Sequence, residues 1–171
     1  MELLKIWLLS IAAAVVYGIL HDQVTARVCI EYFTVFHPPV FATNSPTLLA
    51  LGWGVIATWW MGAILGLPLA VFARIGDAPK LKARDLIRPL AFLLLCMGIV
   101  ALCAGIAGAC WANAQVSAGH LPEPILPAGK QVAFIADRFA HNASYLGGAL
   151  GCAILCLWAA KKRGMSLRSS Q

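Results

Sequence analysis

Four long apolar runs divide the chain, and a polar segment separates each run from the next. An α-helix needs roughly 18 or more mostly apolar residues to cross the hydrocarbon core of a bilayer, and each run reaches that length. The pattern therefore predicts an all-α fold, a bundle of four transmembrane helices. The predicted spans are approximately residues 4–21, 47–73, 89–112 and 137–160.

Local signals mark the boundary between the first two helices. The Pro38–Pro39 pair stops any helix that precedes it, because proline disfavours helical geometry in the residue before it. Ser45 is the expected N-cap of the second helix, and the proline that follows it is the first helical residue. If the first helix continues over residues 21–36, Arg27 and Glu31 lie one turn apart and form an ion pair.

Composition supports a membrane protein. The chain is 61% hydrophobic and 12% charged, with a mean hydropathy of +0.81, whereas soluble domains carry about 25% charged residues. The net charge of +6 does not indicate a nucleic-acid partner, because the basic residues cluster at helix ends and in one short loop. We expect the lipid bilayer as the partner of a single domain, residues 1–164, followed by a polar tail, residues 165–171.

The basic residues also predict an orientation. Ten of the thirteen lysines and arginines fall at the two ends of the chain and in the loop over residues 74–88. Cytoplasmic segments of membrane proteins carry such an excess. Both termini are therefore predicted to be cytoplasmic, with two extracytoplasmic loops at residues 21–45 and 113–131. We expect a bacterial inner (plasma) membrane, with the polar site on the extracytoplasmic side.

Two polar stripes lie near the extracytoplasmic ends of the first and fourth helices. Side chains four residues apart share one face of a helix. The stripes are Asp137, His141 and Tyr145 on the fourth helix, and Tyr17, His21 and Thr25 on the first. Ionisable groups at the membrane edge are costly unless they are paired or functional. Because both stripes lie at one depth, we expect the two helices to lie side by side with a polar site between them.

Imidazole and carboxylate ligands suit divalent zinc, iron or manganese. The predicted metal ligands are His21, Asp137 and His141. The predicted contacts of the bound group are Tyr17, Thr25 and Tyr145. In a catalytic version the metal activates a water or an oxygen species, for hydrolytic or redox chemistry, and Glu31 or Asp22 carries the proton. No HExxH motif strengthens this hypothesis.

Three alternatives remain open. The same polar residues can bond to one another, to lipid headgroups or to water, with no metal. A haem can use His21 and His141 as its two axial ligands. The chain can also be a non-enzymatic membrane subunit, assembly factor or scaffold, because its small-residue helix faces would let a partner helix or a second copy approach closely.

Small residues and cysteines predict how the helices pack. Gly147 and Gly151 are expected to lie against another helix, because a missing side chain permits close backbone contact. The six cysteines include no CxxC pair, and we interpret them as polarizable packing residues.

Three aromatic residues cluster in the first loop. We interpret Tyr32, Phe33 and Phe36 as an interfacial belt that anchors this loop to the membrane surface. The alternative is that they line a pocket for a hydrophobic substrate or a lipid.

Overall fold

The part of the chain that the structure describes is entirely helical. The computed structural model describes residues 1–120, 125–127 and 129–164. Its helices, with no strand in these ranges, are α1 (Glu2–Val28), α2 (Glu31–Thr34), α3 (Pro46–Arg74), α4 (Ala83–Ser117) and α5 (Gln131–Lys162). All except α2 are long and apolar enough to cross a membrane. The predicted all-α class with four membrane-length helices is therefore confirmed, while the predicted tail, 165–171, lies outside the described residues.

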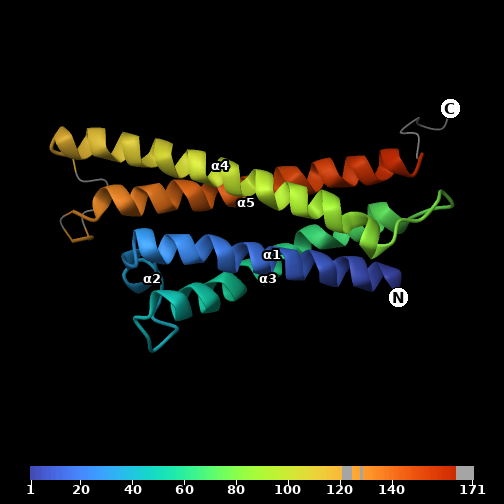
Figure 1. Ribbon diagram of the computed structural model, residues 1–171, viewed down its shortest axis with the longest axis horizontal. Helices are drawn as coiled ribbons and strands as arrows, with labels where there is room; N and C mark the ends of the chain where they lie inside the picture. The colour runs from blue at the N-terminus through green and yellow to red at the C-terminus, as the bar shows by residue number, and fades with distance from the viewer. Residues whose placement is uncertain (121–124, 128, 165–171) are drawn as a thin grey trace.

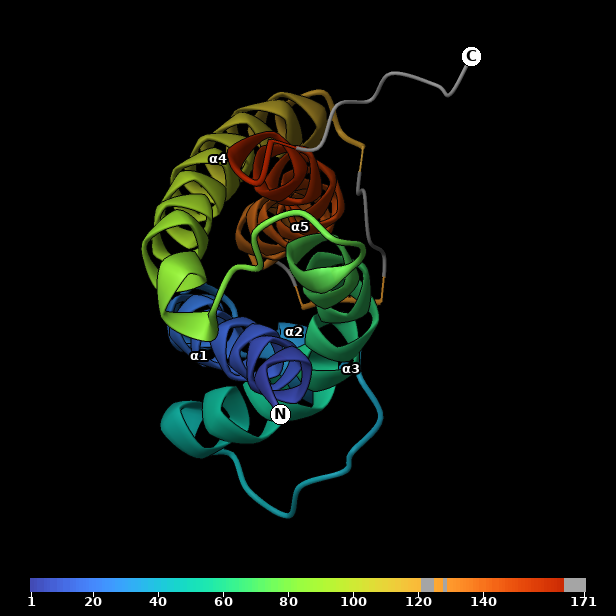
Figure 2. The same ribbon diagram turned by 90° about the vertical axis from the view of Figure 1, so that its right-hand side faces the viewer.

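The four long helices form two closely packed pairs. The most extensive contacts are those of α1 with α3 and of α4 with α5, and Figure 1 shows each pair running along its length. Smaller contacts join α3 to α5 and α1 to α4, so the helices close a ring in the order α1, α3, α5, α4 (Figure 2). We had expected α1 and α5 to be neighbours, but they meet only across the centre of this ring.

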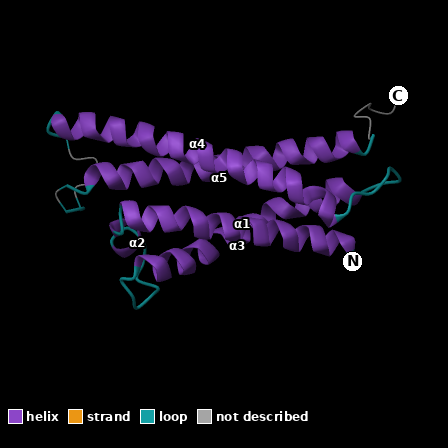
Figure 3. Cartoon of the chain, viewed as in Figure 1, coloured by secondary structure: helices purple, strands orange, loops and turns teal. Residues whose placement is uncertain are grey.

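Loops lie at both ends of the bundle. Residues 29–45, which include α2, lie at one end together with the connection from α4 to α5 (Figure 3). The N-terminus and the connection over residues 75–82 lie at the opposite end. We call these the α2 end and the N-terminal end.

Each long helix extends beyond the span predicted for it. α1 continues to Val28, and α4 runs from Ala83 to Ser117 rather than over 89–112. Apolar residues mark only the part of a helix that fits the hydrocarbon core, whereas backbone hydrogen bonding continues until a residue interrupts it. In α1 that residue is Cys29, whose backbone is extended (φ −149°).

This interruption overturns the predicted pair between Arg27 and Glu31. Glu31 lies in α2 and forms an ion pair with Lys130 at 3.1 Å. Arg27 instead donates hydrogen bonds to Gln23 and to the hydroxyl of Thr47. The two side chains are not one helical turn apart, because no helix joins them.

α1 and α3 touch through their backbones at glycines. A Cβ at Gly54 would lie 2.6 Å from backbone atoms of Ile19, and a Cβ at Gly18 would lie 2.6 Å from the carbonyl oxygen of Gly54. Further along the same contact, a Cβ at Gly62 would lie 2.7 Å from Cα of Ile11. Side chains at these positions would force the two helices apart.

Glycines also shape the contact between α4 and α5. A Cβ at Gly151 would collide with the side chain of Leu93, and a Cβ at Gly147 would lie 3.4 Å from Cγ of Met97. Leu93 and Met97 both belong to α4. The prediction that these two glycines pack against another helix is confirmed.

The cysteines differ in burial, and Cys96 is half-buried. All six are free; Cys29, Cys152 and Cys156 are buried, as expected of packing residues. Cys103 and Cys110, in contrast, lie on exposed positions of α4. For these two the packing interpretation is wrong, because α4 turns that face away from the other helices.

Two separate apolar cores stabilise the ends of the bundle. The core at the α2 end includes Cys29, Tyr32, Phe33, Trp53 and Phe134. The core at the N-terminal end includes Ile6, Leu69, Leu86, Leu155 and Ala159. Polar side chains and a cavity lie between these cores, and the candidate site is there.

Arg163 joins the last helix to the end of α3. Its guanidinium is buried and donates hydrogen bonds to backbone carbonyls of Phe72, Ile75, Ala78 and Pro79. The last carbonyls of a helix have no partner within that helix. Arg163 therefore satisfies the C-terminal end of α3 and fixes α5 beside it.

Candidate metal centre

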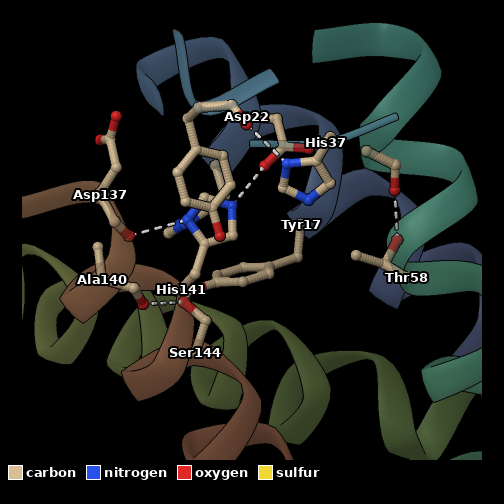
Figure 4. A network of polar contacts seen from close by, with 11 residues as sticks. Tyr17, Asp22, His37, Thr58, Asp137, Ala140, His141 and Ser144 are labelled. Atoms are coloured by element: carbon tan, nitrogen blue, oxygen red, sulfur yellow. Dashed lines mark hydrogen bonds and ion pairs between the residues drawn. The ribbon is translucent and has the colours of Figure 1, made fainter. Parts of the chain in front are cut away.

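Side chains from α1 and α5 meet inside the bundle. Oδ1 of Asp22 lies 3.2 Å from Nε2 of His141, and Nε2 of His21 lies 3.3 Å from Nδ1 of His141. One potential ligand atom from each of these three residues lies within 4.8 Å of the others. Asp22 and His141 are buried, and Figure 4 shows them pointing toward each other. This group could hold a metal ion.

The hydrogen bonds of His141 determine which of its nitrogens is free. Nδ1 lies 2.9 Å from the backbone carbonyl oxygen of Asp137, which can only accept, so Nδ1 carries a hydrogen and donates it. A neutral imidazole then has its lone pair on Nε2. That lone pair faces Oδ1 of Asp22, which is also an acceptor. A proton or a metal cation between these two atoms would satisfy both.

α2 fixes the plane of the His141 ring. Tyr32 stacks on it with ring centroids 4.4 Å apart and an interplanar angle of 23°. Burial raises the pKa of Tyr32 above its usual range, so its phenol is neutral at physiological pH. His37 holds this segment in place, because its Nδ1 donates to the backbone carbonyl of Tyr32 at 2.6 Å. Tyr32 and Phe33 are buried, so they are not the interfacial belt we had expected.

A second polar contact joins α1 to α5 one turn deeper in the bundle. Ser144 donates its hydroxyl hydrogen to the carbonyl of Ala140, so the 2.7 Å contact with Tyr17 is a hydrogen bond from the Tyr17 hydroxyl to Ser144 Oγ. The Tyr17 ring also stacks near His21, with centroids 5.7 Å apart. These contacts hold the two helices at a fixed distance next to the metal-ligand candidates.

The carboxylate of Asp137 lies outside this group. In Figure 4 it points away from His141, and only its backbone carbonyl contacts the ring. Helical side chains lean toward the N-terminus of their helix, so His141 reaches back to the Asp137 carbonyl while the Asp137 side chain lies a turn further out. The structure thus brings Asp22 to the histidines, although the sequence favoured Asp137 as the carboxylate ligand.

The other predicted site residues lie at different distances from the cluster of His21, Asp22 and His141. Tyr145 lines the cavity beside the three clustered residues, whereas Thr25 faces a separate groove. Glu31 lies apart, in α2, where Lys130 and the thiol of Cys29 hydrogen-bond to it. Burial raises the pKa of Glu31, but hydrogen bonds from its own backbone N–H, Lys130 and Cys29 outweigh that effect and hold it below its usual range. Glu31 is therefore a paired carboxylate beside the site.

Sequence reasoning did not identify Tyr32 and Ser144 as parts of the site. Ser144 is three residues after His141 and so shares its helical face, which was an available signal. Tyr32 had no such signal, because it reaches His141 only when the chain folds back after Cys29.

A cavity of about 120 Å³ adjoins the cluster. His21, Asp22, Tyr17, His141 and Ser144 line its polar part. The rest of its wall consists mainly of apolar side chains and glycines from all four long helices, together with Ser10, Thr58 and Tyr145. Apolar cavities of similar size stay free of water and bind small apolar molecules. The site therefore opens onto apolar space inside the bundle.

The arrangement offers two imidazoles and one carboxylate with ligand atoms within 4.8 Å of one another, beside space for a further ligand. Three protein ligands and an open position are typical of catalytic metal sites, whereas structural sites are closed. Comparison with protein-family models, with curated proteins and with solved structures finds no match for this chain. The functional assignment therefore depends on the geometry of these residues.

Proposed function

We propose that this chain is a membrane-embedded metalloprotein that holds one divalent iron through His21, Asp22 and His141 and performs redox chemistry with dioxygen. The observation that carries the proposal is the contact between Nε2 of His141 and Oδ1 of Asp22. Both atoms are acceptors, both are buried, and they are 3.2 Å apart. Buried charged groups require a partner, and a metal cation would be one here.

Two features of the ligand atoms fit a metal: the distance between them and the hydrogen bond that orients the His141 ring. Bonds of about 2.0 Å at tetrahedral angles place two ligand atoms about 3.3 Å apart. The distance between Nε2 of His141 and Oδ1 of Asp22, 3.2 Å, is close to this value. Metal-binding histidines usually donate their other ring N–H to a carbonyl or carboxylate. His141 does so toward the carbonyl of Asp137.

The ligand set and the cavity together favour iron and dioxygen. Two histidines and one carboxylate with open positions are typical of non-haem ferrous oxygenases. When bound, ferrous iron would supply one-electron chemistry with dioxygen. Asp22 would neutralise part of the metal charge, and Tyr32 would keep the His141 ring oriented. The mostly apolar cavity beside them would admit a small apolar molecule such as dioxygen.

The haem alternative fits poorly. The rings of His21 and His141 are in direct edge contact, with centroids 4.4 Å apart and an interplanar angle of 82°. A haem with these axial ligands needs its porphyrin plane between the two rings. That contact leaves no room for it.

The non-enzymatic alternative also loses support. It relied on small-residue faces that would be free to bind partner helices. Glycines of such faces, Gly62 and Gly151 among them, pack inside the bundle against other helices of the same chain.

The orientation belongs to the same proposal. The N-terminal end carries the basic loop around Arg74 and Lys82, and the α2 end carries few basic residues. The positive-inside rule therefore supports a cytoplasmic N-terminal end in a bacterial inner membrane, with the metal centre nearer the extracytoplasmic side.

Metal analysis of the purified protein tests the proposal. After anaerobic loading with ferrous iron and removal of excess metal, we expect one iron per chain. His21→Ala, Asp22→Asn and His141→Ala should each reduce bound iron at least tenfold, because each removes one of three ligands. His120→Ala is the matched control, since His120 is an exposed histidine outside the cluster. No stoichiometric iron in the parent protein, or equal retention in the three variants, would exclude this site.

A further inference from the structure

Two free thiols lie side by side in the core at the N-terminal end. Cys152 and Cys156 are four residues apart in α5, so they share one face of that helix. Their sulfur atoms are 4.0 Å apart, and both residues belong to the apolar core that contains Ile6 and Leu155. The proposed iron centre uses neither thiol. Paired sulfur atoms are potential ligands of a soft metal ion.

The distance between the two sulfur atoms fits a bound metal. Bonds between a metal and a thiolate sulfur are about 2.3 Å long in zinc sites, and two such bonds at about 120° place the sulfurs about 4.0 Å apart. This is the distance between Sγ of Cys152 and Sγ of Cys156. The pair is therefore spaced for an ion with three ligands in a plane, two of which are these thiols.

The inner cavity gives access to the pair and holds further sulfur atoms. Cys152 lines this cavity and is 9% exposed, and Cys156 is 7% exposed. Met61 and Met97 line the same cavity. Cε of Met97 lies 3.6 Å from the position of a Cβ at Gly148, one turn before Cys152 on α5. Because a methionine side chain is flexible, the thioether of Met97 is the candidate third ligand.

The chemistry of the ligands selects the ion. Thiolate and thioether sulfurs favour Cu(I), whereas zinc in structural sites takes four ligands in a tetrahedron. Among the described residues, no histidine or carboxylate joins this pair in a group of three potential ligands, so a four-ligand zinc site is not formed. We propose that Cys152 and Cys156 bind one Cu(I) ion, with Met97 as the third ligand.

Protons and charges balance in this site. Without metal, Cys152 donates its S–H to the carbonyl of Leu65. Binding converts both thiols to thiolates and releases two protons to solvent, with no change in oxidation state. Two thiolates and one Cu(I) carry a single negative charge. Arg163 is buried seven residues after Cys156, on the same side of α5, and forms no ion pair with a carboxylate of the described residues. Its positive charge offsets that of the copper site.

Competition with a coloured chelator tests the proposal. Full-length protein in nanodiscs is reduced, stripped of metal and titrated anaerobically with the Cu(I) complex of bicinchoninate. We expect the parent protein to take one Cu(I) per chain. Cys152→Ala and Cys156→Ala should each lower the affinity at least tenfold, because each removes one of two thiolates. Cys103→Ala and Cys110→Ala are the matched controls, since these cysteines are exposed on α4, and they should keep the parent affinity. No bound copper, or equal affinity in all four variants, would overturn the site.

The atoms around the copper provide a second test. X-ray absorption at the copper edge should show three sulfur neighbours in the parent protein and two in Met97→Leu, a substitution that nearly conserves volume. Nitrogen or oxygen neighbours in the parent would overturn the site, whether or not the cysteine variants fold. Three sulfurs in Met97→Leu would overturn the assignment of the third ligand.

The copper site and the iron centre can be tested separately. His141 and Cys152 are eleven residues apart in α5, about 16 Å along the helix. His21→Ala and Asp22→Asn, which should lose iron, should therefore keep the parent affinity for Cu(I). Loss of copper in these two variants would place the copper at the iron centre and overturn the inference. Copper bound by the cysteines of a protein that never binds iron would support the inference and contradict the proposed function.

Discussion

At the residue scale, His141 is constrained on three sides. The Asp137 carbonyl fixes one nitrogen, Asp22 faces the other, and Tyr32 covers the ring face. Each partner comes from a different element: α5 itself, α1 and α2. A ring held in this way keeps its orientation before any ligand arrives, which lowers the cost of binding.

Cys29 gives a residue-scale prediction that depends on pH. Burial raises the pKa of its thiol to about 11, and the hydrogen bond to Glu31 and the Glu31 charge act in the same direction. The thiolate is the reactive form, so at pH 8 its fraction falls about a hundredfold relative to a thiol with a pKa of 9. We expect alkylation of Cys29 at pH 8 to be at least a hundredfold slower in the folded protein than in the unfolded protein, as measured by mass spectrometry of peptides.

The pH profile is the control. Alkylation should accelerate about tenfold per pH unit between pH 8 and 10, because deprotonation limits it below the pKa. Glu31→Gln should raise the rate, since it removes the nearby negative charge. A fast, pH-independent reaction of Cys29 would contradict the buried position of this thiol.

At the element scale, the contact of α1 with α3 depends on the absence of side chains. In Gly54→Ala, the new methyl group would lie 2.6 Å from backbone atoms of Ile19, and neither backbone can move without separating the helices. We expect a loss of about 1–3 kcal/mol in the free energy of unfolding. Thermal unfolding in detergent should show a lower melting temperature.

Gly98→Ala is the matched control for this substitution. A Cβ at Gly98 meets no atom within 4 Å, so the only change is a better helix-forming residue in α4. It should leave the stability unchanged or raise it by up to about 1 kcal/mol. Equal losses in both variants would show that the close approach of α1 and α3 is not what Gly54 provides.

The long helices and one of their packing faces could be predicted from the sequence. Apolar run length located all four long helices, and glycine spacing identified the face of α5 at Gly147 and Gly151 that packs on α4. The predicted start of α3, with Ser45 as N-cap and Pro46 as first helical residue, is confirmed. The ends of α1 and α4 lie beyond the predicted spans, because hydropathy reports the bilayer and not the backbone hydrogen bonds. Helical periodicity placed His21 and His141 on polar faces, but it does not report rotamers. It could not distinguish the carboxylate of Asp22 from that of Asp137.

Contacts made by segments that fold back on the bundle could not be predicted from the sequence. α2 has four residues, too few for a periodic pattern, yet it brings Tyr32 onto His141. The order of helices around the ring was also not predictable, because short loops allow several arrangements. α1 and α5 consequently meet across the centre and not as neighbours.

At the scale of the whole molecule, two apolar cores stabilise the ends and leave polar groups and space between them. The topology is predicted by the basic residues, which are concentrated at the N-terminal end. In single-cysteine labelling of cells that express a cysteine-free background, positions 30 and 125 should react with an impermeant reagent. Position 80 should react only after the membrane is permeabilised. Cytoplasmic exposure of position 125 would reverse the proposed orientation.

His21 and His141 are 120 residues apart in the chain, although their rings touch. A ribosome adds about 5–20 residues per second, so on the order of ten seconds separate the synthesis of the two histidines. During that interval α1, with His21 and Asp22, is already synthesised, whereas α5, with His141, is not. A chain whose synthesis stops before α5 has His21 and Asp22 but no partner for them. Binding of the proposed iron would therefore have to follow the completion of synthesis, because a truncated product lacks His141.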